Sequence, residues 1–103
     1  MRYVLHPEAY EDIENTVDFY DGRVAGLGAQ FIDQLESDLL KVADAPEQFF
    51  CAYPKTKVYR YPMKRFPYSI FYRIDASYVT VITVVHQARE PLQWLDRLDP
   101  SQK

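Results

Sequence analysis

The spacing of the apolar residues changes halfway along the chain, and this change restricts the possible folds more than any other feature. Up to about residue 43 they recur every three or four positions, which is the period of a helix with one buried face. From residue 57 to residue 86 they alternate or run continuously, which is typical of β-strands. Helical and strand patterns in separate halves of the chain predict an α+β domain.

The first half is expected to form one short strand and two helices. Residues 2–6 alternate as a strand, and Pro7 then suits the first turn of a helix. This helix should end near Gly22, and the second should begin near Leu27 and end before Pro46. The short link predicts an antiparallel helical hairpin, with the acidic residues on its solvated faces. The expected buried residues are Ala9, Ile13, Val17, Tyr20, Leu27, Phe31, Leu35, Leu39 and Val42.

The second half is expected to form a three-stranded antiparallel meander over residues 57–86. Lys57–Pro62 ends in proline and should lie at an edge, whereas Tyr78–His86 is apolar at nearly every position and should be central. The element order is then β-α-α-β-β-β, a helical hairpin packed on a small, mostly antiparallel sheet. Phe66–Ile74 alternates, and the sheet face away from the helices should expose Arg60, Ser69, Phe71 and Arg73.

Length and composition predict a single cytoplasmic domain. The 103 residues suit one domain over 1–103: a strand and helix hairpin in 1–50, the meander in 57–86 and a C-terminal tail in 87–103. The single cysteine, Cys51, rules out an internal disulfide and fits a reducing compartment; it falls in a stretch expected to be a loop. No apolar run approaches the length of a membrane span, so no membrane association is expected.

The charge is unevenly distributed along the chain. Residues 1–50 carry eleven acidic and three basic side chains, whereas residues 51–74 carry six basic side chains and no acidic one. The net charge of −3 therefore hides a positive field over the first strands of the meander. Such a field attracts a polyanion or an acidic partner, although it could equally complement the acidic helices of the same molecule.

The residue pattern supplies few candidates for chemistry. No Ser–His–Asp order, glycine-rich phosphate loop or Cys/His cluster is present, so no metal or cofactor is expected. His86 is the best candidate for a general acid or base, although a structural strand-end histidine is the commoner role. The basic strands could bind phosphates, with Tyr59, Tyr61 or Phe71 stacking on bases. Trp94 in the tail should cap the core or anchor a partner.

Several segments together resemble the RelE/ParE toxin superfamily, most closely its ParE-like, plasmid-stabilisation branch. They are RFPYSIFYR at 65–73 and VVHQAREP at 84–91 with Trp94 and Arg97, preceded by HPEA at 6–9, Asp12-Ile13, Phe19-Tyr20, Gly26-Leu27-Gly28 and Phe31. The resemblance covers about residues 2–97. It implies the toxin of a bacterial type II toxin–antitoxin system, with a helix hairpin on a small sheet. It also implies a cognate antitoxin that folds over the toxin in a hetero-oligomer.

The resemblance leaves the mechanism open between two branches. ParE-like toxins act on DNA gyrase without hydrolysis, whereas RelE-like toxins are endoribonucleases that cut mRNA on the ribosome with basic residues of the strands and a C-terminal Tyr or His. Arg60 falls near a basic position of the RelE type. Ser69 falls where those enzymes tend to hold arginine, and Trp94 falls near their tyrosine, whose phenol an indole cannot replace as a proton shuttle.

These departures favour a ParE-like toxin that acts on gyrase. The residues expected to contact the target or the antitoxin are Arg60, Lys64, Arg65, Arg73, Arg89, Trp94 and Arg97. If the chain is RelE-like instead, the expected catalytic set is His86, Arg65 and Arg73. A third reading is an inactive homologue kept as a protein-binding module, because the acidic net charge departs from the basic charge of many family toxins.

Overall fold

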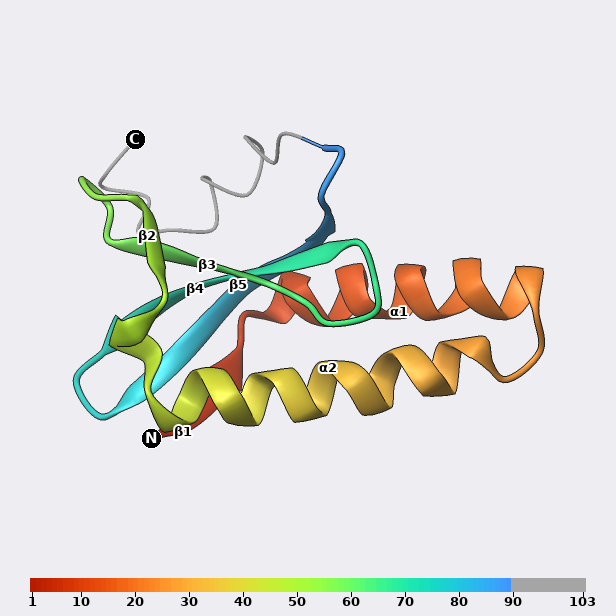
Figure 1. Ribbon diagram of the computed structural model, residues 1–103, viewed down its shortest axis with the longest axis horizontal. Helices are drawn as coiled ribbons and strands as arrows, with labels where there is room; N and C mark the ends of the chain where they lie inside the picture. The colour runs from red at the N-terminus through yellow and green to blue at the C-terminus, as the bar shows by residue number, and fades with distance from the viewer. Residues whose placement is uncertain (90–103) are drawn as a thin grey trace.

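The computed structural model describes residues 1–89 as two helices packed on a five-stranded sheet (Figure 1). The sheet order is β1-β5-β4-β3-β2, in which β1 is parallel to β5 and the other neighbours are antiparallel. The α+β prediction is confirmed. The elements are β1 (Arg2–Leu5), α1 (Pro7–Arg23), α2 (Leu27–Asp44), the 3-10 helix η1 (Pro46–Gln48), β2 (Phe50–Tyr53), β3 (Val58–Pro62), β4 (Tyr68–Asp75) and β5 (Tyr78–His86).

The sheet contains one more strand than the sequence pattern indicates. Residues 50–53, expected to be a loop, form β2, in which Phe50 pairs with Arg60 and Cys51 with Tyr59. The prediction that β3 is an edge strand is therefore wrong, because β2 covers its outer side. A four-residue strand is too short to show a clear period, so only its pairing with β3 distinguishes it from a loop.

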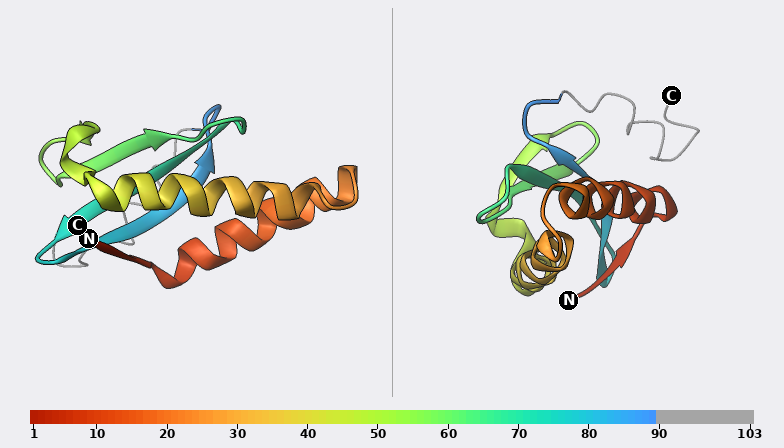
Figure 2. Two further views of the ribbon diagram at one scale, coloured as in Figure 1. Left: turned by 60° about the horizontal axis from the view of Figure 1, so that its bottom comes forward. Right: turned by 90° about the vertical axis from the view of Figure 1, so that its right-hand side faces the viewer.

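The helical hairpin forms as predicted, and two glycines allow the short link and the close approach of the helices at its tip. Gly26, just before α2, has a φ of 87°, a conformation that residues with a Cβ rarely adopt. A Cβ at Gly28 would lie 2.7 Å from Cγ1 of Val17, so α1 and α2 approach closely there. At the other end of α1, His6 caps the helix, because its Nδ1 accepts a hydrogen bond from the Glu8 N–H at 3.1 Å. Figure 2 shows the two helices together on one side of the sheet.

The main core lies between the helices and the sheet and is rich in aromatic rings. Phe31 of α2 lies edge-on to Phe66 and Tyr68, with ring centroids 5.3 and 5.4 Å apart. Tyr20 of α1 contacts the same aromatic cluster, and its ring centroid lies 5.3 Å from that of Phe66. The predicted apolar stripe of α2 is confirmed, since Phe31, Leu35, Leu39 and Val42 are all buried.

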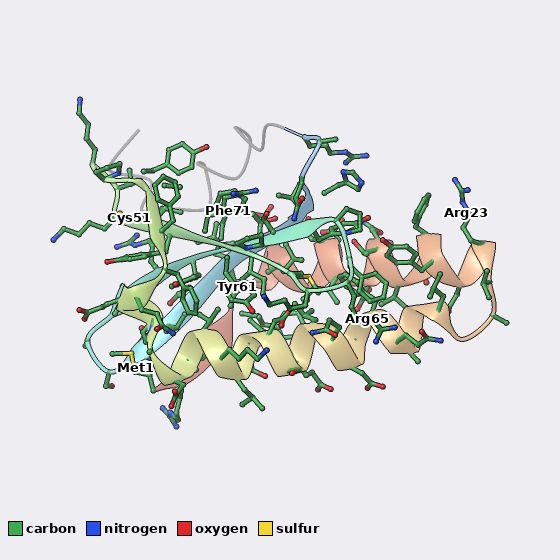
Figure 3. The ribbon with its side chains drawn as sticks, viewed as in Figure 1. Met1, Arg23, Cys51, Tyr61, Arg65 and Phe71 are labelled. Carbon is green, nitrogen blue, oxygen red and sulfur yellow. The ribbon has the colours of Figure 1, made fainter. Side chains whose placement is uncertain are left out.

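Asp38 contradicts the prediction that the acidic residues lie on solvated faces. It is 0% exposed, and its carboxylate accepts hydrogen bonds from the Tyr61 hydroxyl at 3.3 Å and the Lys64 backbone N–H at 3.0 Å. A buried carboxylate persists where donors replace the water that it loses. Asp38 therefore attaches the β3–β4 hairpin to α2 (Figure 3 shows Tyr61 on the α2 side of the strands).

A second, smaller core lies on the sheet face away from the helices. Val58, Phe71 and Ile82 are buried there, with Ala52, Tyr53 and Val85 packed against them. The expectation that Ser69 and Phe71 are exposed is wrong, because they are only 1% and 5% exposed. The extra strand β2 supplies part of the cover, since both Ala52 and Tyr53 belong to it.

Candidate functional site

The turn after β5 separates two cavities. This turn is closed by a hydrogen bond from the Arg89 N–H to the His86 carbonyl at 3.0 Å, and both residues line both cavities. The sheet cavity has a volume of about 300 Å³ and is lined by Phe50, Ala52, Tyr53, Arg60, Ser69, Phe71, Val85, His86, Gln87 and Arg89. The helix cavity has a volume of about 450 Å³ and is lined by Asp12, Asn15, Thr16, Phe19, Tyr20, Tyr68, Thr83, Val84, Val85, His86 and Arg89.

Strand register assembles the sheet cavity. Phe50 of β2 pairs with Arg60 of β3, which pairs with Phe71 of β4. Because paired residues project from the same face, the Arg60 side chain lies between two aromatic residues. His86, the last residue of β5, and Arg89 in the turn after it complete the lining, so the described lining contains three basic side chains and no acidic one.

Ser69 is the unusual polar residue of the sheet cavity. Its side chain is 1% exposed, and its Oγ is the one buried side-chain oxygen or nitrogen within residues 1–89 that has no hydrogen-bond partner. Buried hydroxyl groups are normally satisfied, so an orphaned one that lines a cavity indicates an available donor.

His86 is held at the boundary between the cavities. Its ring lies edge-on to Tyr68, with centroids 5.2 Å apart, and its Nδ1 accepts a hydrogen bond from the Ala88 N–H at 3.0 Å. An accepting Nδ1 means that the neutral ring carries its proton on Nε2. The geometry therefore fixes both the tautomer and the orientation of this side chain.

The helix cavity lies where α1 crosses the C-terminal part of β5. The Thr83 hydroxyl donates to the Asp12 carboxylate at 2.6 Å and joins the two elements. Burial, together with the neighbouring Tyr68, raises the pKa of Tyr20 above its usual value of 10.0. Phe19 remains 51% exposed, with the Arg23 guanidinium 4.9 Å from its ring centroid. The cavity is thus mixed in character, with an exposed aromatic residue at one side.

The structure brings together only some of the predicted site residues. Arg60, His86 and Arg89 meet in the sheet cavity, whereas Lys64, Arg65 and Arg73 line neither cavity. Arg73 forms an ion pair with Asp75, in which its Nη2 lies 3.8 Å from the Asp75 Oδ1. Arg65 has a φ of 68° and lies over Phe66, away from Phe71 (Figure 3). Trp94 and Arg97 lie outside the described residues.

Sequence reasoning missed the contribution of β2 and misplaced two tyrosines. The contribution of Phe50, Ala52 and Tyr53 was not predicted, because their segment shows no clear strand period. The aromatic residues at both ends of this segment were the sequence signal that could have indicated a strand. Tyr59 and Tyr61 cannot stack on a ligand in the sheet cavity, because they face the helices. Tyr59 stacks on Tyr72 at 5.4 Å, and Tyr61 binds Asp38. Of the three predicted stacking residues, only Phe71 lines the cavity.

Within residues 1–89, no three His, Cys, Asp or Glu side chains are grouped so as to hold a metal ion. No helix within the same residues is both long and apolar enough to cross a bilayer.

Comparison with known proteins identifies a family. The family model described as the ParE toxin of the type II toxin–antitoxin system parDE matches residues 3–91. A solved structure described as the chromosomal ParDE TA system from P. aeruginosa is similar with a TM-score of 0.73 and 13% sequence identity, over 84% of this chain and 95% of that chain. Identity this low shows a shared fold alone. No curated protein matches significantly.

Proposed function

The chain belongs to the ParE toxin family of type II toxin–antitoxin systems, and from this premise we propose that it arrests bacterial growth by acting on DNA gyrase. It does so in the cytoplasm, until a cognate antitoxin binds and neutralises it. The observation that carries the proposal is the family match, which spans nearly all of the described residues. Gyrase is the target that the ParE-like resemblance implies.

The arrangement of basic residues favours a non-hydrolytic toxin over an mRNA nuclease. Acid–base cleavage needs its groups within hydrogen-bond reach of one phosphate. His86 lines both cavities, but Arg65 and Arg73 line neither. Ser69 also stands where RelE-like enzymes tend to hold arginine. The alternative nuclease would have to use Arg60 and Arg89 beside His86 instead.

A direct test uses the purified toxin and gyrase. The toxin should inhibit supercoiling of relaxed plasmid DNA, and adding the antitoxin should restore it. In parallel, induction of the toxin alone in bacteria should lower thymidine incorporation before amino-acid incorporation. An earlier fall in amino-acid incorporation would contradict the gyrase proposal and favour ribosome-dependent cleavage. Unchanged growth would indicate an inactive homologue that only binds its partner.

The helix cavity is the proposed docking site of the antitoxin. It runs between α1 and the sheet and has Phe19 half-exposed on its wall. An exposed aromatic ring beside a concave surface is typical of an anchor for a partner. His86 and Arg89 at one end suit an acidic residue of the partner.

Two aromatic substitutions on α1 test this docking site. Phe19→Ala should weaken antitoxin binding by at least about tenfold. Tyr10→Ala is the matched control, because Tyr10 is 56% exposed on the same helix but does not line the cavity. Equal affinity of wild type and Phe19→Ala in calorimetry would exclude this cavity as the docking site.

A further inference from the structure

We propose that the basic turn between β3 and β4, residues 63–67, extends the antitoxin docking site, with Lys64 and Arg65 binding carboxylates of the antitoxin. The inference rests on the proposed docking of the antitoxin in the helix cavity. It adds the chemistry of the partner, because the segment that passes the basic turn should be acidic. Neither Lys64 nor Arg65 lines the cavity itself, so the docking surface continues beyond the cavity wall.

The basic turn holds Arg65 in an unfavourable backbone conformation. Arg65 has a φ of 68°, and the Phe66 N–H donates to the Lys64 carbonyl at 2.8 Å across it. A three-residue turn with a positive φ at its centre is rare and strained, whereas glycine would adopt this φ freely. Strained residues persist where the side chain or the conformation serves a function, so Arg65 is a candidate for a contact outside the molecule.

Two contacts hold the basic turn in place from beneath. The buried carboxylate of Asp38 accepts a hydrogen bond from the Lys64 N–H at 3.0 Å. Phe66 is 7% exposed and lies edge-on to Phe31, with ring centroids 5.3 Å apart. The side chains of Lys64 and Arg65 are exposed and therefore project from an ordered base. Such preorganisation lowers the entropic cost of binding a partner.

The two cations are not neutralised by acids of the described chain. Neither Lys64 nor Arg65 forms an ion pair within residues 1–89. Arg73, by contrast, pairs with Asp75. The guanidinium of Arg65 lies over its neighbour Phe66, 5.9 Å from the ring centroid. The charge of the basic turn therefore does not complement the acidic helices by direct contact, and it can bind carboxylates of a partner.

The basic turn adjoins the helix cavity at two points. The ring centroid of Phe66 lies 5.3 Å from that of Tyr20, which lines the cavity. The Pro67 carbonyl accepts a hydrogen bond from the Gln87 N–H at 2.8 Å, and Gln87 directly follows the cavity residue His86. A partner segment that leaves the cavity on this side therefore passes beside the basic turn.

Charge on the helices restricts where an acidic segment can lie. Exposed acids on α1 and α2, among them Asp18, Asp21, Asp33 and Glu36, repel a carboxylate. The basic turn attracts one, so the two effects together fix the register of the partner.

The test measures the affinity of the purified full chain for the purified antitoxin by calorimetry. At low ionic strength, Arg65→Gly should weaken binding by at least about threefold. It should not lower the urea midpoint, because relief of strain offsets the added freedom of the unfolded chain. Lys57→Gly is the matched control, since Lys57 is also basic and has a φ of 55°, but it lies at the opposite end of β3. This control should bind the antitoxin as wild type does.

Two further variants separate charge from shape. Arg65→Lys should bind the antitoxin more tightly than Arg65→Gly, and Arg65→Glu should bind it more weakly, because like charges repel. Raising the salt concentration to about 0.5 M should reduce the differences, since the contacts are exposed.

The proposal is overturned if Arg65→Gly binds the antitoxin as wild type does, or if Arg65→Glu binds as tightly as Arg65→Gly. Equal loss of affinity in Lys57→Gly would also overturn it. Loss of gyrase inhibition by Arg65→Gly with unchanged antitoxin affinity would overturn it and assign the basic turn to the target instead. If wild type itself does not bind the antitoxin, the proposed docking and this inference both fail, so the two failures are distinguishable.

Discussion

Replacing Asp38 by alanine should destabilise the domain markedly, although an acidic residue on a helix is usually dispensable. The carboxylate is fully buried and accepts hydrogen bonds from Tyr61, Lys64 and the Gln34 amide. The Gln34 side chain is half-exposed and can turn to water. The Tyr61 hydroxyl is buried and cannot do so, and the Lys64 N–H, which is partly buried, can do so only in part.

The magnitude follows from those two donors. Leaving a buried donor unsatisfied costs about 1–3 kcal/mol. Two such donors would give about 2–6 kcal/mol, and the upper part of this range is not reached because the Lys64 N–H is only partly buried. Removing the desolvated charge itself offsets part of this loss. We therefore expect the free energy of unfolding to fall by about 2–4 kcal/mol in Asp38→Ala. Tyr61→Phe should remove one contact alone and cost about 1 kcal/mol.

Equilibrium unfolding in urea, followed by circular dichroism, measures these changes. Asp33→Ala is the matched control, since Asp33 is an exposed acid on the same helix, and its effect should stay within about 0.5 kcal/mol. A loss below about 1 kcal/mol in Asp38→Ala would refute the argument. So would strict additivity of Asp38→Ala and Tyr61→Phe, because contacting residues should show a coupling energy.

Three further predictions concern the core, the response to pH and toxicity. Leu35 is 2% exposed, so Leu35→Ala should cost about 2–5 kcal/mol in urea unfolding; a loss below about 1 kcal/mol would contradict its place in the core. Burial, with smaller effects from Tyr59 and Cys51, raises the pKa of Tyr72 above 10.0. Stability should therefore be complete below pH 10 and fall as the pH rises further, because the unfolded chain loses this proton first. Tyr72→Phe should reduce that decline, at a cost of about 1 kcal/mol at neutral pH for the lost bond to the Pro46 carbonyl; an unchanged alkaline profile would count against the argument. Arg89→Ala should relieve growth arrest more than Arg65→Ala does, because Arg89 lines both cavities and Arg65 lines neither. Growth arrest is measured by counting the colonies that survive induction. A stronger effect of Arg65→Ala would show that neither cavity is needed for toxicity.

The site was only partly predictable from the residues. Arg60 and Arg89 could be named in advance because basic side chains predominate among the charged residues of 51–89, and His86 because it is one of only two histidines in the sequence. Their meeting could not be predicted, since it depends on the pairing of Arg60 with Phe71 and on the turn that follows His86. Arg65 and Arg73 looked equivalent to them in sequence. Their separate positions follow from a turn with positive φ and from the ion pair with Asp75.

The sequence by itself determined the helices, the long strands and the α+β class. Two local patterns show this: the helical spacing of Phe31, Leu35 and Leu39 and the apolar run of β5. Each pattern indicates which face of its element is buried in the folded protein. Tertiary structure alone decided that residues 50–53 become β2, that Asp38 is buried and that Ser69 lines a cavity without a partner. These outcomes depend on contacts between residues far apart along the chain. Such contacts stabilise the fold but do not produce a periodic pattern of apolar residues within a short segment, so the sequence pattern cannot predict them.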